Sequence, residues 1–172
     1  MVWPICVAVD WSCYFCVSDG EKPIFSNIST VTLDESLLLS GEQITTGKMS
    51  TIVGSDDIVS VEFLKASKQP ILTDEGVNIT YDISDDGKTL TGYIGDINDP
   101  HFVAVLSDSF NNNTDTIDED YQFTLFKTLD QDVTDSIPLK IKVTDYDGDS
   151  SQNHLKITII DDTTAALTTP DL

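Results

Sequence analysis

The chain has 172 residues and a formal net charge of −21, because 30 aspartates and glutamates stand against nine lysines and no arginine. This charge excludes nucleic acid as a partner, since phosphate binding requires a basic surface, and it disfavours anionic membrane surfaces. Hydrophobic residues make up 40% of the chain, which is enough for a folded core. The sequence has no run of about 18 apolar residues, so it predicts no membrane insertion.

The first 23 residues differ in composition from the rest. They contain all three cysteines, Cys6, Cys13 and Cys16. An odd number of cysteines gives no disulfide framework, and the CxxC pattern has no second cysteine pair or histidine nearby to complete a zinc site. The first 17 residues lack Lys and Arg, and Asp10 interrupts their apolar run, so they do not fit a signal peptide. We interpret residues 1–23 as an atypical leader or the remnant of a preceding module, followed by a linker.

From Ile24 onward, apolar and polar residues alternate in short runs separated by turn residues, and no convincing helical period appears. This pattern predicts an all-β domain, a β-sandwich of about nine strands over residues 24–164, followed by a linker over 165–172. Residues 34–39 alone are compatible with a helical turn. The expected strands are 28–33, two short ones at 44–46 and 51–53, 59–63, 77–83, 89–94, 101–106, 121–126, 139–144 and 154–160.

Four segments of the chain carry more specific expectations. The apolar run His101–Leu106 predicts a strand at the centre of a sheet, and Asp86-Gly87 predicts a tight hairpin turn. The acidic run Asp118-Glu119-Asp120 is typical of a solvated loop, as a continuation of the polar segment before it. Pro138 begins the last hairpin of the domain.

The most informative stretch follows the first arm of that hairpin. Asp145, Asp147 and Asp149 alternate along the chain around Gly148, where a turn can fold the three carboxylates toward one point. Three carboxylates repel each other unless a cation lies between them, and Ca²⁺ is the hard cation that suits flexible oxygen ligands. The spacing is not that of an EF-hand, because Gly148 comes too early and Lys156 stands where that loop needs a bidentate Glu.

A turn of this kind needs ligands from other loops. Asp34 and Glu35 follow the first predicted strand, and we expect them to meet the Asp145–Asp149 turn at one end of the sandwich. Two further acidic pairs flank the predicted domain and are also candidate calcium ligands. They are Asp19 and Glu21 before its first strand, and Asp161 and Asp162 after its last.

Several segments together resemble the repeat modules of large RTX-type adhesins, which type I secretion exports. The resemblance covers residues 24–164 in order, and the first 18 residues depart from it. The segments are Val31–Ser36, Asp86–Tyr93, Tyr121–Leu125 followed by Leu129-Asp130, and, as the most specific, Val143–Ser150 with Ile157–Asp162.

This resemblance implies an immunoglobulin-like or cadherin-like repeat on the bacterial cell surface, which binds Ca²⁺ within the fold and at the junctions between neighbouring repeats. Asp19 and Glu21 would then lie at the junction where the chain arrives, and Asp161 and Asp162 at the junction where it leaves. Its partners would be neighbouring repeats of the same chain, and its function that of an extender in cell adhesion and biofilm formation. A module that binds a peptide or sugar, framed by residues 107–120 and 65–76, is an alternative, and an accessory domain of a secreted hydrolase is a third. We expect no enzymatic activity, because no HExxH, GxSxG or P-loop pattern is present and both histidines lie in strand patterns.

Overall fold

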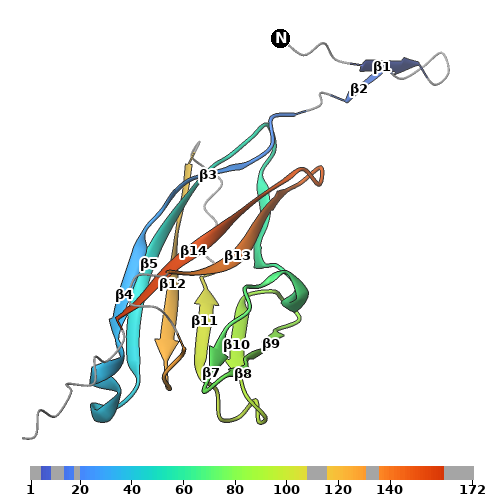
Figure 1. The fold of residues 1–172 in the computed structure, drawn as a ribbon. Helices are drawn as coiled ribbons and strands as arrows, with labels where there is room; N and C mark the ends of the chain where they lie inside the picture. The colour runs from blue at the N-terminus through green and yellow to red at the C-terminus, as the bar shows by residue number, and fades with distance from the viewer. Residues whose placement is uncertain (1–4, 9–13, 18–19, 108–115, 131–135, 161–172) are drawn as a thin grey trace, which may run out of the picture.

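The computed structural model describes residues 5–8, 14–17, 20–107, 116–130 and 136–160. Within these ranges the protein consists of β-strands and two short 3₁₀ helices, which confirms the all-β fold class. Two curled sheets pack face to face along the length of the molecule, as Figure 1 shows. The chain enters at one end of this sandwich, and β14, the last strand, finishes at the other.

The larger sheet has six strands, and every neighbouring pair in it is antiparallel. The predicted central strand is confirmed, because β11 lies between β10 and β12. In spatial order the strands are β3 (Ile24–Ile28), β5 (Gln43–Ile52), β12 (Thr116–Leu125), β11 (Phe102–Leu106), β10 (Thr89–Tyr93) and β9 (Thr80–Ile83).

The smaller sheet contains the expected last hairpin, and its first strand joins the last one in parallel. Its strands are, in order, β4 (Thr30–Asp34), β14 (Ser150–Ile160), β13 (Ser136–Asp145) and β6 (Ile58–Phe63). If β3, β5, β6, β11, β12, β13 and β14 are taken as strands A to G, the sheets contain the orders A-B-E-D and C-F-G. These are the orders of an immunoglobulin-like sandwich.

The described part of residues 24–160 contains twelve strands, not nine. The additional strands include β3 and the small β7–β8 hairpin (Thr73–Asp74 and Val77–Asn78). Two further strands, β1 (Ile5–Ala8) and β2 (Tyr14–Val17), pair with each other. The 3₁₀ helices are η1 (Glu35–Ser40), at the predicted helical turn, and η2 (Ala66–Lys68). None of the helices in the described ranges has the length and apolar character that a membrane crossing requires.

The core is formed by the side chains that alternate inward from both sheets. Phe102 and Phe123 stack with ring centroids 5.2 Å apart, and Tyr81 meets Phe102 edge-on at 6.2 Å. On β13 every second residue from Ile137 to Asp145 is buried, so this strand contributes a continuous row to the core. The last position of that row is an aspartate, Asp145.

Two sequence predictions about strand boundaries are wrong for the same reason. β5 runs without interruption through Gly47, although two short strands are expected there. β12 begins at Thr116 and includes Asp118-Glu119-Asp120, which are expected in a loop. The two strands pair with each other over ten residues. This pairing holds both segments in the β conformation, although their composition favours turns.

The chain passes from one sheet to the other at Ser29, between β3 and β4. The Ser29 N–H donates to the Lys48 carbonyl at 2.8 Å, and the Lys48 N–H donates to Ser29 Oγ at 2.7 Å. The buried Tyr121 hydroxyl donates to the Ser29 carbonyl at 2.7 Å. Gly47 lies against the Tyr121 ring, and a β-carbon at this position would come within 2.2 Å of it.

We therefore predict that Gly47→Ala destabilises the protein by about 1–3 kcal/mol, the usual cost of overpacking a core. The cause is displacement of the Tyr121 ring, which also weakens its hydrogen bond to Ser29. Urea denaturation followed by far-UV circular dichroism measures this change. The matched control is Thr46→Ala, at the exposed neighbouring position on the same strand. Equal midpoints for both variants would show that the ring has room to move.

Candidate metal centre

The turn between β13 and β14 holds the three aspartates that the sequence singles out. The Asp145 N–H donates to the Asp149 carbonyl at 3.0 Å, and the Gly148 N–H donates to the Asp145 carbonyl at 3.3 Å. Gly148 has φ +99°, a conformation that L-residues rarely adopt, so the glycine allows the chain to reverse here. The Asp149 N–H also donates to Asp147 Oδ1 at 3.3 Å, which keeps the second carboxylate inside the turn.

The turn brings the three carboxylates together. Each of Asp145, Asp147 and Asp149 offers one oxygen, and these oxygens lie within 4.8 Å of one another. Asp145 is only 2% exposed, Asp149 is partly buried and Asp147 is exposed. Asp145 Oδ1 is buried and has no hydrogen-bond partner in the described part of the chain. The cluster thus combines an open side with one buried oxygen that nothing in the described protein satisfies.

The electrostatics of Asp145 follow from this position. Burial raises the pKa of the Asp145 carboxyl above its ordinary value, because a buried charge loses hydration. The neighbouring Asp147 carboxylate raises the pKa of Asp145 further, through its contact and its negative charge. The side chain is in an unfavourable environment for its charge unless a proton or a cation compensates it.

The donor set fits a hard divalent cation. Three carboxylates supply oxygen ligands only, with no sulfur or imidazole among them, which is the chemistry that Ca²⁺ and Mg²⁺ prefer. Two oxygens that bind the same Ca²⁺ at 2.3–2.6 Å lie no further apart than roughly 5 Å, and these three meet that limit. The cluster can therefore hold a metal ion.

Asp34 and Glu35 do not join this cluster, so the expectation that they meet the Asp145–Asp149 turn is wrong. Asp34 pairs with Ile160 at the end of β14, whereas the turn precedes Ser150 at its beginning. β14 has 11 residues, so at about 3.3 Å per residue its ends lie about 30 Å apart. The reason is that β4 runs parallel to β14, which places the end of β4 at the opposite end of the sandwich (Figure 1).

At that opposite end both side chains have structural partners. Asp34 caps η1 by accepting hydrogen bonds from the Ser36 N–H at 2.9 Å and the Ser36 hydroxyl at 2.6 Å. Glu35 is 4% exposed, and its Oε1 accepts from the Leu129 N–H at 2.8 Å. These contacts explain the two acids without a metal.

Glu21, in contrast, lies at the same end as the turn. Its N–H donates to Ser55 Oγ at 2.8 Å, and its carbonyl accepts from the Ser55 N–H at 2.9 Å. The same short segment continues through Asp56 and Asp57 to Ile58, which pairs with Asp145. The structure thus adds two acids that the sequence analysis does not single out. Their sequence signal is a pair of adjacent aspartates directly before a strand.

Three remaining predicted ligands, Asp19, Asp161 and Asp162, lie outside the described residues. The contact between Asp74 and His101 is a partly buried acidic contact of a different kind. Asp74 Oδ2 lies 3.0 Å from Nε2 of the buried His101, and this contact holds the β7–β8 hairpin against the six-stranded sheet. This pair consists of one carboxylate and one imidazole and lies where two strand segments meet. We therefore interpret it as a structural contact.

Comparison of the chain with protein-family models, curated protein sequences and solved structures finds no match to any of them. The resemblance to RTX-type adhesin repeats therefore rests on the sequence motifs described above.

The raised pKa of Asp145 predicts a pH dependence in metal-free protein. The folded state holds this proton more tightly than the unfolded chain, whose Asp pKa is about 3.9. The bound proton therefore adds to the free energy of unfolding below that pH. This added stability is lost as pH rises through the pKa of Asp145 in the folded state. In EDTA, Asp145→Asn should therefore unfold at higher urea than the wild type at pH 7, with little difference at pH 3. Asp85→Asn, in an exposed turn, is the control. Parallel pH profiles for all three proteins would contradict the assignment.

A structural role for Glu35 predicts a different behaviour. Glu35→Ala leaves the buried Leu129 N–H without this acceptor, which should lower the free energy of unfolding by about 1–3 kcal/mol. The loss should be the same in EDTA and in millimolar Ca²⁺, measured by urea denaturation, because the side chain lies at the opposite end of the sandwich from the Asp145–Asp149 turn. A loss that appears only with Ca²⁺ present would make Glu35 a ligand after all.

Proposed function

We propose that this chain is a calcium-stabilised extracellular module of a large bacterial surface adhesin, and that it acts as an extender in adhesion and biofilm formation. The observation that carries the proposal is the Asp145–Asp147–Asp149 cluster with its buried, unsatisfied Asp145 oxygen. The resemblance to type I secreted RTX-type repeats supports the adhesin setting, and the sandwich fold is compatible with it. The module has a binding and mechanical role in this proposal, not an enzymatic one.

Calcium suits the cluster better than magnesium. Mg²⁺ demands a near-ideal octahedron at about 2.0–2.1 Å and keeps much of its water, whereas Ca²⁺ tolerates irregular carboxylate sets. Here the ligands come from one short turn and differ widely in exposure, from the buried Asp145 to the exposed Asp147. When bound, Ca²⁺ supplies the positive charge that the three carboxylates lack.

Bound cation would act on the stability of the fold through Asp145. This residue occupies the last inward position of β13, so its carboxylate is buried together with the core side chains of the same strand. Compensating its charge removes the penalty of burying it, and a cation that binds only the folded state stabilises that state by mass action. The turn is then held closed by its side chains as well as by its backbone.

The position of the cluster suits a junction between modules. Glu21, on the arriving chain, and Asp56 and Asp57, on the β5–β6 connection, lie at the same end of the sandwich as the cluster. Calcium bound by acids of both the arriving segment and the module itself would link the two. Such a link would fix the angle between consecutive modules. Outside the cell, calcium near 1 mM matches the affinities of extracellular modules, about 10⁻⁴–10⁻³ M.

The proposal predicts that Ca²⁺ raises the melting temperature and that chelation reverses the rise. At 10 to 100 times the dissociation constant, one site adds about 1.4–2.7 kcal/mol, which for a chain of this size corresponds to roughly 3–11 °C. Differential scanning calorimetry in EDTA, Ca²⁺ and Mg²⁺ measures the shift.

The Asp145→Asn and Asp147→Asn variants should lose most of this calcium shift. Asp85→Asn carries the same change of charge in a different turn and should keep it. A melting temperature that does not respond to EDTA or Ca²⁺ would remove the calcium part of the proposal. Equal losses in all three variants would show a general charge effect in place of a site.

A further inference from the structure

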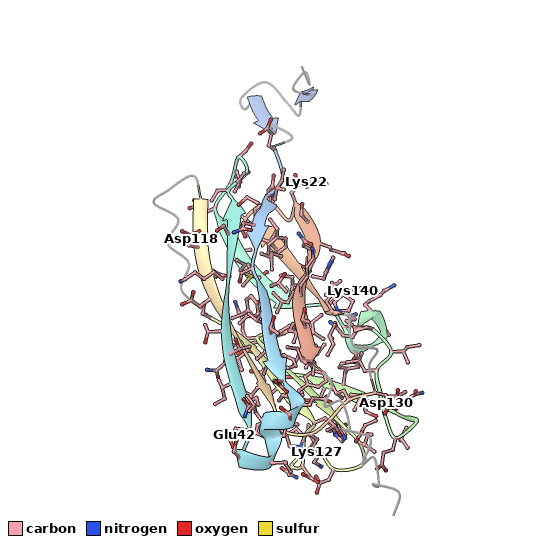
Figure 2. The ribbon with its side chains drawn as sticks, turned by 60° about the vertical axis from the view of Figure 1, so that its left-hand side comes forward. Lys22, Glu42, Asp118, Lys127, Asp130 and Lys140 are labelled. Carbon is pink, nitrogen blue, oxygen red and sulfur yellow. The ribbon has the colours of Figure 1, made fainter. Side chains whose placement is uncertain are left out.

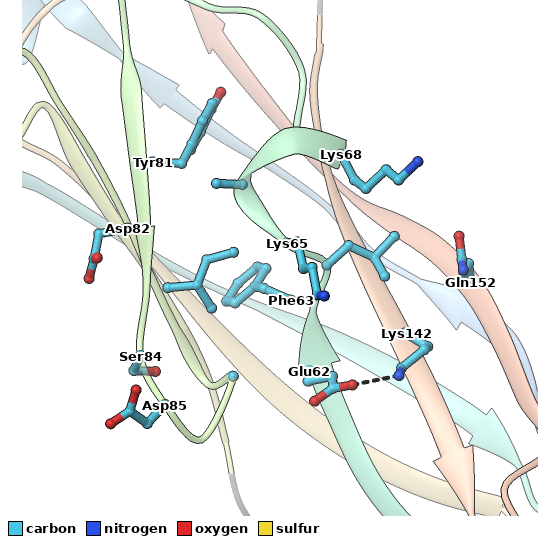
Figure 3. A pocket seen from close by; sticks show the side chains of 14 residues that line it. Glu62, Phe63, Lys65, Lys68, Tyr81, Asp82, Ser84, Asp85, Lys142 and Gln152 are labelled. Atoms are coloured by element: carbon cyan, nitrogen blue, oxygen red, sulfur yellow. Dashed lines mark ion pairs between the residues drawn. The ribbon is translucent and has the colours of Figure 1, made fainter.

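A groove of about 700 Å³ lies between the edge strands β6 and β9, as Figure 3 shows. Its charged lining residues are three lysines and three carboxylates, namely Lys65, Lys68, Lys142, Glu62, Asp82 and Asp85. Lys142 is already paired with Glu62 at 2.7 Å. These charges balance one another, so the groove favours a ligand of neither sign.

The hairpin that precedes the sandwich carries a more specific arrangement. β1 and β2 form a two-stranded sheet of their own, and within the described ranges they pair with no strand of the larger sheets. In two views the hairpin lies beyond the end of the sandwich at which Lys22 leads into β3 (Figure 1, Figure 2). A two-stranded hairpin by itself is marginally stable in water, so the pairing of β1 with β2 calls for a further constraint.

The register of the two strands assigns a partner to Cys6. Its Cα partner on β2 is Cys16, in step with the neighbouring pair of Val7 and Phe15. Residues directly opposite each other in antiparallel strands lie on the same face, with Cα atoms about 4.5 or 5.5 Å apart. A disulfide bond requires Cα atoms about 4.4–6.8 Å apart, so both kinds of directly opposite pair meet this requirement.

The number of cysteines alone does not assign this pairing. The chain has three, and Cys13 lies outside the described residues. The two cysteines on the described strands are the ones that the register brings opposite each other. A bond between them would restrict the unfolded chain over residues 6–16, which stabilises the paired strands.

We propose that Cys6 and Cys16 form an intramolecular disulfide bond that closes the β1–β2 hairpin, while Cys13 keeps its thiol. The two thiols lose two protons and two electrons, and a disulfide oxidant such as oxidised glutathione takes these up and becomes two thiols. One protein thiolate first attacks the oxidant, which forms a mixed disulfide and releases one thiol. The other protein thiolate then attacks the protein sulfur of the mixed disulfide, which releases the second thiol.

The inference does not depend on the calcium site or on the adhesin setting. Both the register of the hairpin and the chemistry of its thiols are independent of the Asp145–Asp149 turn. An extracellular location would add an oxidising compartment, in which disulfide bonds persist.

Peptide mapping of the full chain tests the pairing. The protein is equilibrated with reduced and oxidised glutathione, alkylated, and digested with chymotrypsin without reduction. Cleavage after Trp11 and Tyr14 places the three cysteines on separate peptides, so each possible bond gives a different linked pair in the mass spectrum. We expect linked peptides that contain Cys6 and Cys16, together with an alkylated Cys13.

Three single variants compare the possible bonds. Cys13→Ser retains the proposed pair, whereas Cys6→Ser and Cys16→Ser each retain one of the other cysteines together with Cys13. Titration with mixtures of reduced and oxidised glutathione gives an equilibrium constant for the bond in each variant. The constant for Cys13→Ser should be at least tenfold higher than that for either of the other two variants.

Several results would overturn the proposal. They are a main oxidised product that joins Cys13 to another cysteine or joins two chains, three thiols that stay reduced in excess oxidised glutathione, and an equilibrium constant for Cys13→Ser no higher than for the other variants. Circular dichroism checks that the sandwich of each variant is folded. If a variant fails to fold, the linked peptides of the wild-type chain decide the question.

Discussion

The mutual repulsion of three carboxylates at the end of one hairpin is the constraint on which the proposed role depends. The backbone bonds between Asp145 and Asp149 hold the turn closed, and Asp145 belongs to the same inward row as Ile141 and Val143. The carboxylate therefore cannot turn to water without disturbing the end of the core. The packing of the core and the charge of the turn are therefore coupled through Asp145, which belongs to both.

The distribution of charge follows the architecture. Several acidic residues cap, tether or cluster at the two ends of the sandwich, among them Asp34, Asp130 and Asp145. At the η1 end, Asp130 accepts hydrogen bonds from the Glu75 and Gly76 N–H groups at 3.1 and 2.8 Å, and the Gly76 bond in particular lowers the pKa of Asp130. At the other end, Asp145 Oδ1 has no such donor among the described residues. The outer side of the smaller sheet carries Lys140, Lys142 and Lys156.

Local patterns in the sequence identify the fold class, the central strand β11, the β13–β14 hairpin and the three aspartates that converge in its turn. These features depend on alternation and on turn residues a few positions apart. The sequence does not show that Asp34 and Glu35 lie at the other end, because that depends on β4 running parallel to β14. It also does not show that Asp118–Asp120 form strand, because their pairing with β5 is a contact between distant segments.

The crossover at Ser29 has a mechanical consequence. It transfers the arriving chain from the six-stranded sheet to β4, which lies parallel to the departing strand β14. Tension applied between the two ends of the domain would slide β4 along β14, so the hydrogen bonds of that pair would bear the load together in shear. Strands that unzip break such bonds one after another at a lower force. This geometry is well suited to a link in a chain that is pulled.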